Sequence, residues 1–202
     1  HPLQSAADPE EAVRALPGSY FGVEAEEPLL GLLETLVSRL GGKPLRVPGE
    51  AKGLYHLAAA LASNGVVAFF ALAADLFDRA GIPPAESSQA LLPLLRGTLE
   101  NLERLGLPRA LTGPISRGDH GTLLRHLDSL GREAPELIAL YCLLGRRMVA
   151  LACAKGSLDD DGACLMLRTL ATAEKGGGPE AGREINAGGP EAGREIKEKA
   201  CA

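Results

Sequence analysis

The apolar segment from Leu57 to Ala74 constrains the fold of this chain most strongly, because so long an apolar run must be shielded from water. It is interrupted by Ser63, Asn64 and Gly65, and it lies within a predicted helix from about Glu50 to Arg79. A transmembrane helix needs about 20 apolar residues. This run is marginal in length, contains polar groups and lacks a flanking basic cluster. We therefore predict a buried core helix or a subunit-interface helix.

The first 48 residues alternate between helical and strand patterns. Asp8, Pro9 and two acidic residues predict a helix start, and that helix must stop by Pro17. Strands are expected at residues 19–24 and 44–47, on either side of a helix from Pro28 to Leu40 with apolar residues at helical spacing. A strand, a helix and a strand within about 30 residues form a βαβ unit with parallel strands. Residues 1–48 are therefore predicted to be part of an α/β domain.

From residue 49 to residue 173 the pattern is helical throughout, which makes the fold class mainly α, with an all-helical domain after the α/β part. The expected helix starts are Ser87 or Ser88, Asp119, Pro135 and Ser157. The helix from Asp119 is expected to stop at Gly131. Residues 174–202 contain two copies of a Gly- and Glu-rich repeat, at 178–185 and 189–196. Such a composition cannot bury a core, so we predict a low-complexity, disordered tail.

Charge and aromatic content exclude several kinds of partner. The net charge is −5 and aromatic residues make up 3% of the 202 residues. This balance argues against nucleic acid and against an anionic membrane as partners. The four cysteines form no Cys-x-x-Cys pair, so no zinc site is expected, and a reducing cytoplasm is the predicted location. Cys142 and Cys153 lie about three helical turns apart and are predicted to share one buried face.

The loop from Leu111 to Asp119, with the sequence LTGPISRGD, is more elaborate than a helix connection requires. Gly113 permits a positive φ and Pro114 fixes φ near −65°, so a bend is predicted. Thr112, Ser116 and Arg117 could then direct hydroxyl and guanidinium donors toward one place. The simpler interpretation is a helix connection with Asp119 as the N-cap.

A narrow polar stripe follows one face of the predicted helix that begins near Glu50. Lys52 and His56 are four residues apart, Ser63 is about two turns beyond His56, and Asn64 flanks the stripe. A lysine in an apolar setting has a tunable pKa and can bind a carboxylate or donate a proton. The structural alternative is a snorkelling lysine at a helix end and a satisfied core histidine.

Together, His-Pro-Leu-Gln at the start, Lys-Gly-Leu-Tyr-His and Ser63-Asn64 in the helix, and LTGPISRGD in the loop resemble a bacterial family. This family has a Rossmann-like domain followed by the C-terminal domain of unknown function 2520, and the resemblance covers residues 1 to 173. It is similar in architecture to 6-phosphogluconate, prephenate and ketopantoate dehydrogenases and to pyrroline-5-carboxylate reductase. The resemblance implies an N-terminal domain that binds NAD(P) and a helical domain that forms a homodimer.

The same resemblance implies roles for individual residues. Lys52 would take the place of a catalytic lysine, with His56 beside it. His1 would belong to a substrate-binding His-Pro element, and Ser63 and Asn64 would contact the substrate. Thr112, Gly113 and Arg117 would close over it.

Because the chain begins at His1 and contains no Gly-x-Gly-x-x-Gly motif, we expect it to be the C-terminal part of a longer protein, inactive alone. The leading hypothesis is an NAD(P)-dependent oxidoreductase acting on a small carboxylate-bearing oxo, hydroxy or imino substrate. The alternatives are a non-catalytic helical dimerisation or ligand-sensing module and, less favoured, a helix bundle at a membrane surface.

Overall fold

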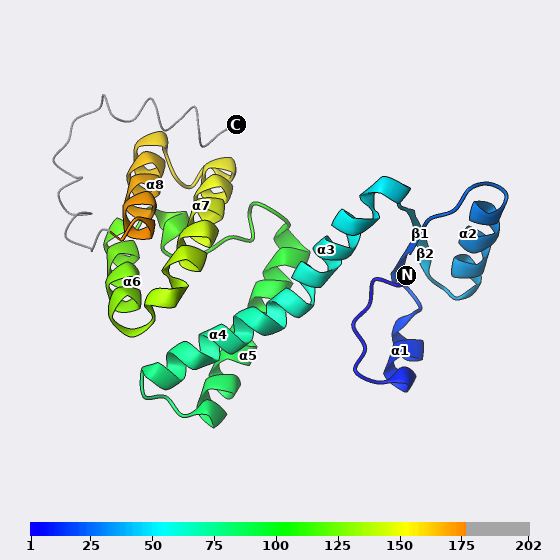
Figure 1. Cartoon of the computed structure of the whole chain (residues 1–202), viewed down its shortest axis with the longest axis horizontal. Helices are drawn as coiled ribbons and strands as arrows, with labels where there is room; N and C mark the ends of the chain where they lie inside the picture. The colour runs from blue at the N-terminus through cyan, green and yellow to red at the C-terminus, as the bar shows by residue number, and fades with distance from the viewer. Residues whose placement is uncertain (177–202) are drawn as a thin grey trace. The chain divides into compact units, whose positions relative to one another are not determined.

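The computed structural model describes residues 1–176 and is mainly helical, as predicted (Figure 1). The chain divides into two compact units, His1–Ala74 and Asp75–Ala202. The division falls within a helix rather than at the expected change of pattern near residue 48. The predicted disordered tail lies outside the described residues, apart from its first three.

The first unit contains the predicted βαβ unit. Helix α1 (Pro9–Ala15) precedes strand β1 (Tyr20–Val23), helix α2 (Leu29–Arg39) and strand β2 (Lys43–Arg46). The strands are parallel, with Tyr20 opposite Lys43 and Val23 opposite Arg46. Asp8 caps α1 as expected, because its carboxylate accepts from two backbone N–H groups of the first turn. The small core of this unit consists of Phe21, Val23 and Val37, with Leu16, Leu30 and Leu33 packed against them.

A short N-terminal segment adds to the other edge of β1. Pro2 forms an antiparallel bridge to Phe21, the Leu3 N–H donates to the Tyr20 carbonyl at 2.7 Å, and the Gly22 N–H donates to the His1 carbonyl at 2.8 Å. This pairing fixes His1 beside Gly22, near the carboxyl end of β1.

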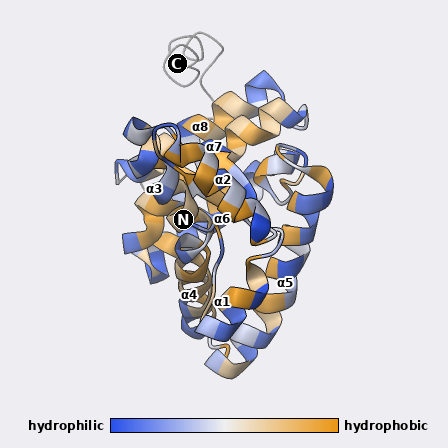
Figure 2. Cartoon of the chain, turned by 90° about the vertical axis from the view of Figure 1, so that its right-hand side faces the viewer, coloured by the Kyte–Doolittle hydropathy of each residue, from blue (hydrophilic) through white to orange (hydrophobic). Residues whose placement is uncertain are grey.

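The long apolar helix is broken once. A short 3₁₀ turn (Gly49–Ala51) leads into α3 (Lys52–Ala62), which is followed after Ser63 by α4 (Asn64–Arg79). Neither α3 nor α4 has a buried residue, although Figure 2 colours much of α4 as hydrophobic. Leu54 is 72% exposed and Val67 is 70% exposed. The expectation of a buried core helix is therefore wrong within the first unit, none of whose other described residues buries these side chains.

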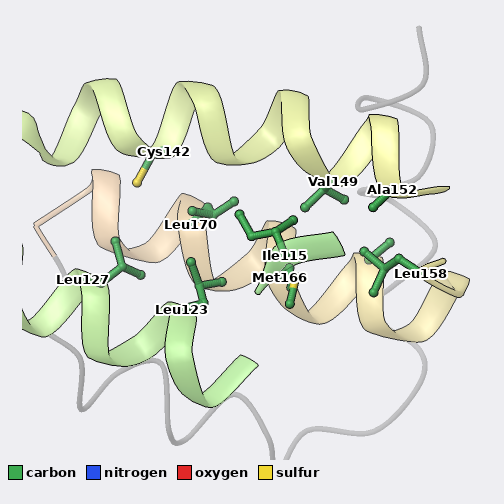
Figure 3. Packing of buried hydrophobic residues seen from close by; sticks show 10 residues of the cluster. Ile115, Leu123, Leu127, Cys142, Val149, Ala152, Leu158, Met166 and Leu170 are labelled. Atoms are coloured by element: carbon green, nitrogen blue, oxygen red, sulfur yellow. The ribbon is translucent and has the colours of Figure 1, made fainter. Parts of the chain in front are cut away.

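The second unit is built on three packed helices. Helix α5 (Pro84–Leu105) precedes a 3₁₀ turn (Ile115–Arg117), α6 (His120–Glu133), a second 3₁₀ turn (Pro135–Leu137), α7 (Ile138–Lys155) and α8 (Asp160–Glu174). The core lies between α6, α7 and α8 (Figure 3). Its labelled members are Ile115, Leu123, Leu127, Cys142, Val149, Ala152, Leu158, Met166 and Leu170.

Three expected helix boundaries are wrong. Helix α5 begins at Pro84, so Ser87 lies inside it and donates back to the Pro83 carbonyl at 3.1 Å. Helix α6 continues through Gly131 to Glu133. Helix α8 is capped by Asp159, whose carboxylate accepts from the Gly162 N–H at 2.8 Å, rather than by Ser157.

The expected shared face of two cysteines is also wrong. Cys142 is fully buried, whereas Cys153, on the same helix, is exposed. Eleven residues correspond to slightly more than three turns, and the buried stripe of α7 passes through Val149 and Ala152 instead.

Two helical stretches are long and apolar enough to cross a membrane by length and composition. They are Gly49–Arg79, none of whose tested window is buried, and Pro135–Lys155, 22% of whose window is buried. One or two such helices are weak evidence for a membrane span, since core helices of other proteins pass the same test.

Candidate functional site

A cavity of about 540 Å³ in the first unit brings together four of the residues singled out in the sequence: His1, His56, Ser63 and Asn64. Its walls come from the N-terminal segment of residues 1–5, from Leu45 of β2 and from one face of α3. His56 and Ser63, which were predicted to share a helix face, both line the cavity, although α3 ends at Ala62. The pairing of residues 1–3 with β1 supplies the opposite wall.

The cavity lies where the topology brings α3 back to the sheet. The short turn after β2 starts α3 at the carboxyl edge of the two parallel strands, which is the edge where open α/β folds bind ligands. The imidazole rings of His1 and His56 meet edge to face, with 5.5 Å between their centroids. The Tyr55 ring meets the His1 ring in the same way at 5.7 Å.

Several polar groups line the cavity, and none of the lining side chains carries a permanent charge. Besides the two imidazoles it includes the hydroxyls of Ser5, Tyr55 and Ser63 and the amides of Gln4 and Asn64. Among the described lining residues there is no carboxylate and no lysine or arginine. The charge that an imidazole carries when protonated is positive, as is that of the His1 α-ammonium group. The lining thus suits an anionic ligand better than a cationic one.

Lys52 is not among the residues that line this cavity. Its Nζ lies 2.8 Å from Glu24 Oε2, and its side chain is 71% exposed. Glu24 in turn lines a second cavity, of about 510 Å³, at the carboxyl ends of β1 and β2. The sequence did not reveal this ion pair, because Glu24 follows β1 and meets Lys52 only through the strand pairing.

The predicted bend at Gly113 is present in the second unit. Gly113 has φ +93°, and a 3₁₀ turn follows at Ile115–Arg117. Asp119 caps α6 as predicted: its carboxylate accepts from the Thr122 N–H at 2.9 Å and from the Thr122 hydroxyl at 2.7 Å. The Thr122 hydroxyl and N–H hold the pKa of Asp119 below its usual value. Thr112 and Arg117 are exposed, and so are available to a ligand or a partner.

Lys155, for which no role was predicted, holds this loop in place by hydrogen bonds. Lys155 Nζ donates to the Leu111 carbonyl at 2.7 Å and lies 3.4 Å from Ser116 Oγ. Ser116 is buried, and its hydroxyl lies 3.3 Å from that of Ser157. A lysine just before Gly156, at a helix end, is ordinary helix chemistry, so nothing in the sequence marked it as the loop's anchor.

The cavity residues belong to the first unit, and the loop residues Thr112, Gly113 and Arg117 belong to the second. A single crevice formed by both sets therefore stays a prediction. Within residues 1–176, no group of three or more His, Cys, Asp or Glu side chains is arranged to hold a metal ion.

These features define the class of protein. It is a mainly helical chain with a small α/β part, and a polar cavity lies between that part and the first turns of a long apolar helix. Residues 19–148 match the model of the domain of unknown function DUF2520. The chain belongs to this family, which confirms the resemblance inferred from the sequence.

Two solved structures are similar to the chain. The protein TM1727 from Thermotoga maritima is 26% identical, with a TM-score of 0.66 over 77% of this chain and 61% of its own length. A Bacteroides fragilis protein, BF3122, named a "putative NADP oxidoreductase", is 27% identical, with a TM-score of 0.54 over 66% of this chain and 50% of its own length. The chain thus spans less than two thirds of either relative. No curated protein matches it.

Proposed function

We propose that this chain supplies the substrate-binding part of an NAD(P)-dependent oxidoreductase whose substrate is a small carboxylate-bearing oxo, hydroxy or imino compound. The observation that carries the proposal is the cavity where His1, His56, Ser63 and Asn64 converge, between the N-terminal segment that pairs with β1 and the helix α3. Membership of the DUF2520 family and similarity to a protein named for NADP chemistry support the reaction class.

The lining suggests how the substrate is held. A carboxylate accepts hydrogen bonds from imidazole N–H, hydroxyl and amide groups, all of which the cavity offers. His56, at the wall, can exchange the proton that accompanies hydride transfer. Lys52 remains the predicted second proton donor. Its present partner, Glu24, is exposed enough that the pair can separate at little energetic expense.

The nucleotide is assigned to sequence that these 202 residues do not contain, since no Gly-x-Gly-x-x-Gly motif occurs in them. The decisive experiment is a fluorescence titration of NADPH and NADH against the product of the complete gene. It is followed by NADPH oxidation assays with a panel of 2-oxo and 2-imino acids. We expect micromolar cofactor binding and turnover of at least one acid. Failure of the complete protein to bind either cofactor would overturn the proposal.

The non-catalytic alternative is favoured by a different observation, the exposed apolar surface of α3 and α4. We propose that a second copy of the chain covers this surface in a homodimer. The dimer is compatible with catalysis, so only a dimer that binds no cofactor supports a purely structural or ligand-sensing role.

A further inference from the structure

Gly22 occupies an unexpected place, in the middle of a four-residue strand. Glycine weakens a strand, and inside one it often marks the close approach of another group. Its φ is not among the positive values in this chain, so the backbone does not require glycine here. A Cβ at position 22 would lie 2.4 Å from the hydroxyl oxygen of Tyr55 and 2.6 Å from Cζ of the same ring. The missing side chain therefore makes a hollow that receives the phenol.

The Tyr55 phenol held in this hollow contacts His1, which lines the cavity. Tyr55 Oη lies 3.3 Å from Nδ1 of His1 and 3.4 Å from the His1 carbonyl oxygen. The Tyr55 and His1 rings are nearly perpendicular, at 84°. Hydrogen bonding and edge-to-face packing together restrict the His1 ring to one orientation.

We propose that Tyr55, admitted by Gly22, is a positioning residue that fixes the His1 imidazole in the cavity beside His56, so that the two rings form one binding site for a ligand carboxylate. The Tyr55 hydroxyl donates its single proton to the His1 carbonyl, so its oxygen accepts from Nδ1–H of His1 and fixes that tautomer of the neutral ring. The doubly protonated ring then offers Nε2–H to the ligand. The carboxylate part rests on the proposed function, whereas the positioning part does not.

The charged and titratable groups around His1 are few. Tyr55 and His56 face it from α3, and the α-ammonium group of His1 itself donates to the Gly22 carbonyl at 3.0 Å. A change in the state of the His1 ring on removal of the Tyr55 hydroxyl can therefore be traced to that hydroxyl.

The test is ¹⁵N NMR of the histidine side chains at pH 8, where neutral imidazoles report their tautomer. Tyr55→Phe removes the hydroxyl but keeps the ring, and Gly22→Ala displaces the ring. The chain offers a matched control in Tyr141→Phe, because Tyr141 Oη lies 2.8 Å from Nδ1 of His126 with 5.9 Å between the ring centroids. We expect both cavity variants to turn a single Nδ1–H form of His1 into a mixture, and the control to alter His126 alone. An unchanged His1 tautomer in Tyr55→Phe and Gly22→Ala would overturn the positioning role. Wild-type NMR shifts of Phe21, Val23 and Val37, the core of the first unit, report that each cavity variant is folded.

A second titration separates the two parts of the proposal, with pyruvate as the probe. We expect pyruvate to shift the His1 and His56 signals, and Tyr55→Phe to weaken this binding several-fold while Tyr141→Phe leaves it unchanged. Equal pyruvate affinity in wild type and Tyr55→Phe would contradict positioning of a binding group. No shift at either histidine in the wild type would overturn the carboxylate site and the proposed substrate class, whatever the tautomer result.

Discussion

Gly145 of α7 controls how closely the helix α8 approaches. A Cβ at this position would lie 2.9 Å from both Cδ atoms of Leu170, which is itself fully buried. We expect Gly145→Ala to destabilise the protein by about 1–2 kcal/mol, because overpacking outweighs the better helix propensity of alanine. Urea unfolding followed by circular dichroism measures the change.

A matched substitution in α5 isolates the packing effect. Gly97 also lies inside a helix, but a Cβ there would meet nothing within 4 Å. Gly97→Ala should therefore stabilise the protein by roughly 0.5–1 kcal/mol through helix propensity alone. If both alanines stabilise the protein equally, α7 and α8 do not pack as described.

Single residues also show where sequence reasoning about the site succeeded and where it could not. Helical periodicity placed His56 and Ser63 together, and both line the cavity, although α3 ends before Ser63. Tyr55 stands beside His56 in the sequence, yet its importance depends on His1 and Gly22, which only the strand pairing brings to it. Lys52 was assigned to the same stripe, but an ion pair with Glu24 holds it outside the cavity lining.

At the scale of the helices, a partly buried histidine of α6 forms a hydrogen bond to α8. His120 Nε2 lies 2.9 Å from Thr169 Oγ1, and burial lowers the pKa of His120. The unfolded chain therefore binds this proton more readily than the folded protein does. His120 therefore lowers the free energy of unfolding as the pH falls below about 6.5, the pKa of histidine in the unfolded chain. Above that pH it has no such effect.

We expect His120→Gln to reduce the loss of stability between pH 7.5 and pH 5.5, since glutamine has no proton to gain there. Thermal unfolding midpoints across this range measure the effect. His126→Gln is the control, because His126 lies on the same helix but is exposed. The same pH slope in wild type and His120→Gln would contradict the role of His120.

Local chemistry fixed some element boundaries and tertiary contacts fixed others. Asp8 and Asp119 cap helices as predicted, since a cap depends on a few neighbouring residues. Ser157 was predicted to cap α8, but its hydroxyl is occupied by Ser116 and by the Ala152 carbonyl, and Asp159 takes the position. A sequence pattern does not show that Ser116, 41 residues earlier, competes for that hydroxyl.

For the whole molecule, the main question is what covers the apolar surface that α3 and α4 expose. Large exposed apolar side chains on α3 and α4 are Leu54, Leu57, Leu61, Val67, Phe69 and Leu76, and those on α5 are Leu92, Leu94, Leu99 and Leu102. Contiguous exposed apolar surface marks a protein or membrane interaction site. The acidic net charge and the polar residues Ser63 and Asn64 within the run favour a protein surface.

We expect the wild-type protein to sediment as a dimer at micromolar concentration. Leu61→Glu, on the 62% exposed Leu61 of α3, should weaken the dimer at least tenfold, because the charge must either be desolvated in the interface or keep the two copies apart. The matched control is Val13→Glu on α1, where Val13 is 67% exposed outside the apolar helices, and it should leave the dimer intact. A wild-type monomer that floats with liposomes would instead assign this surface to a membrane. A wild-type monomer that stays in solution would show that the apolar surface needs neither partner, and the homodimer would have to be abandoned.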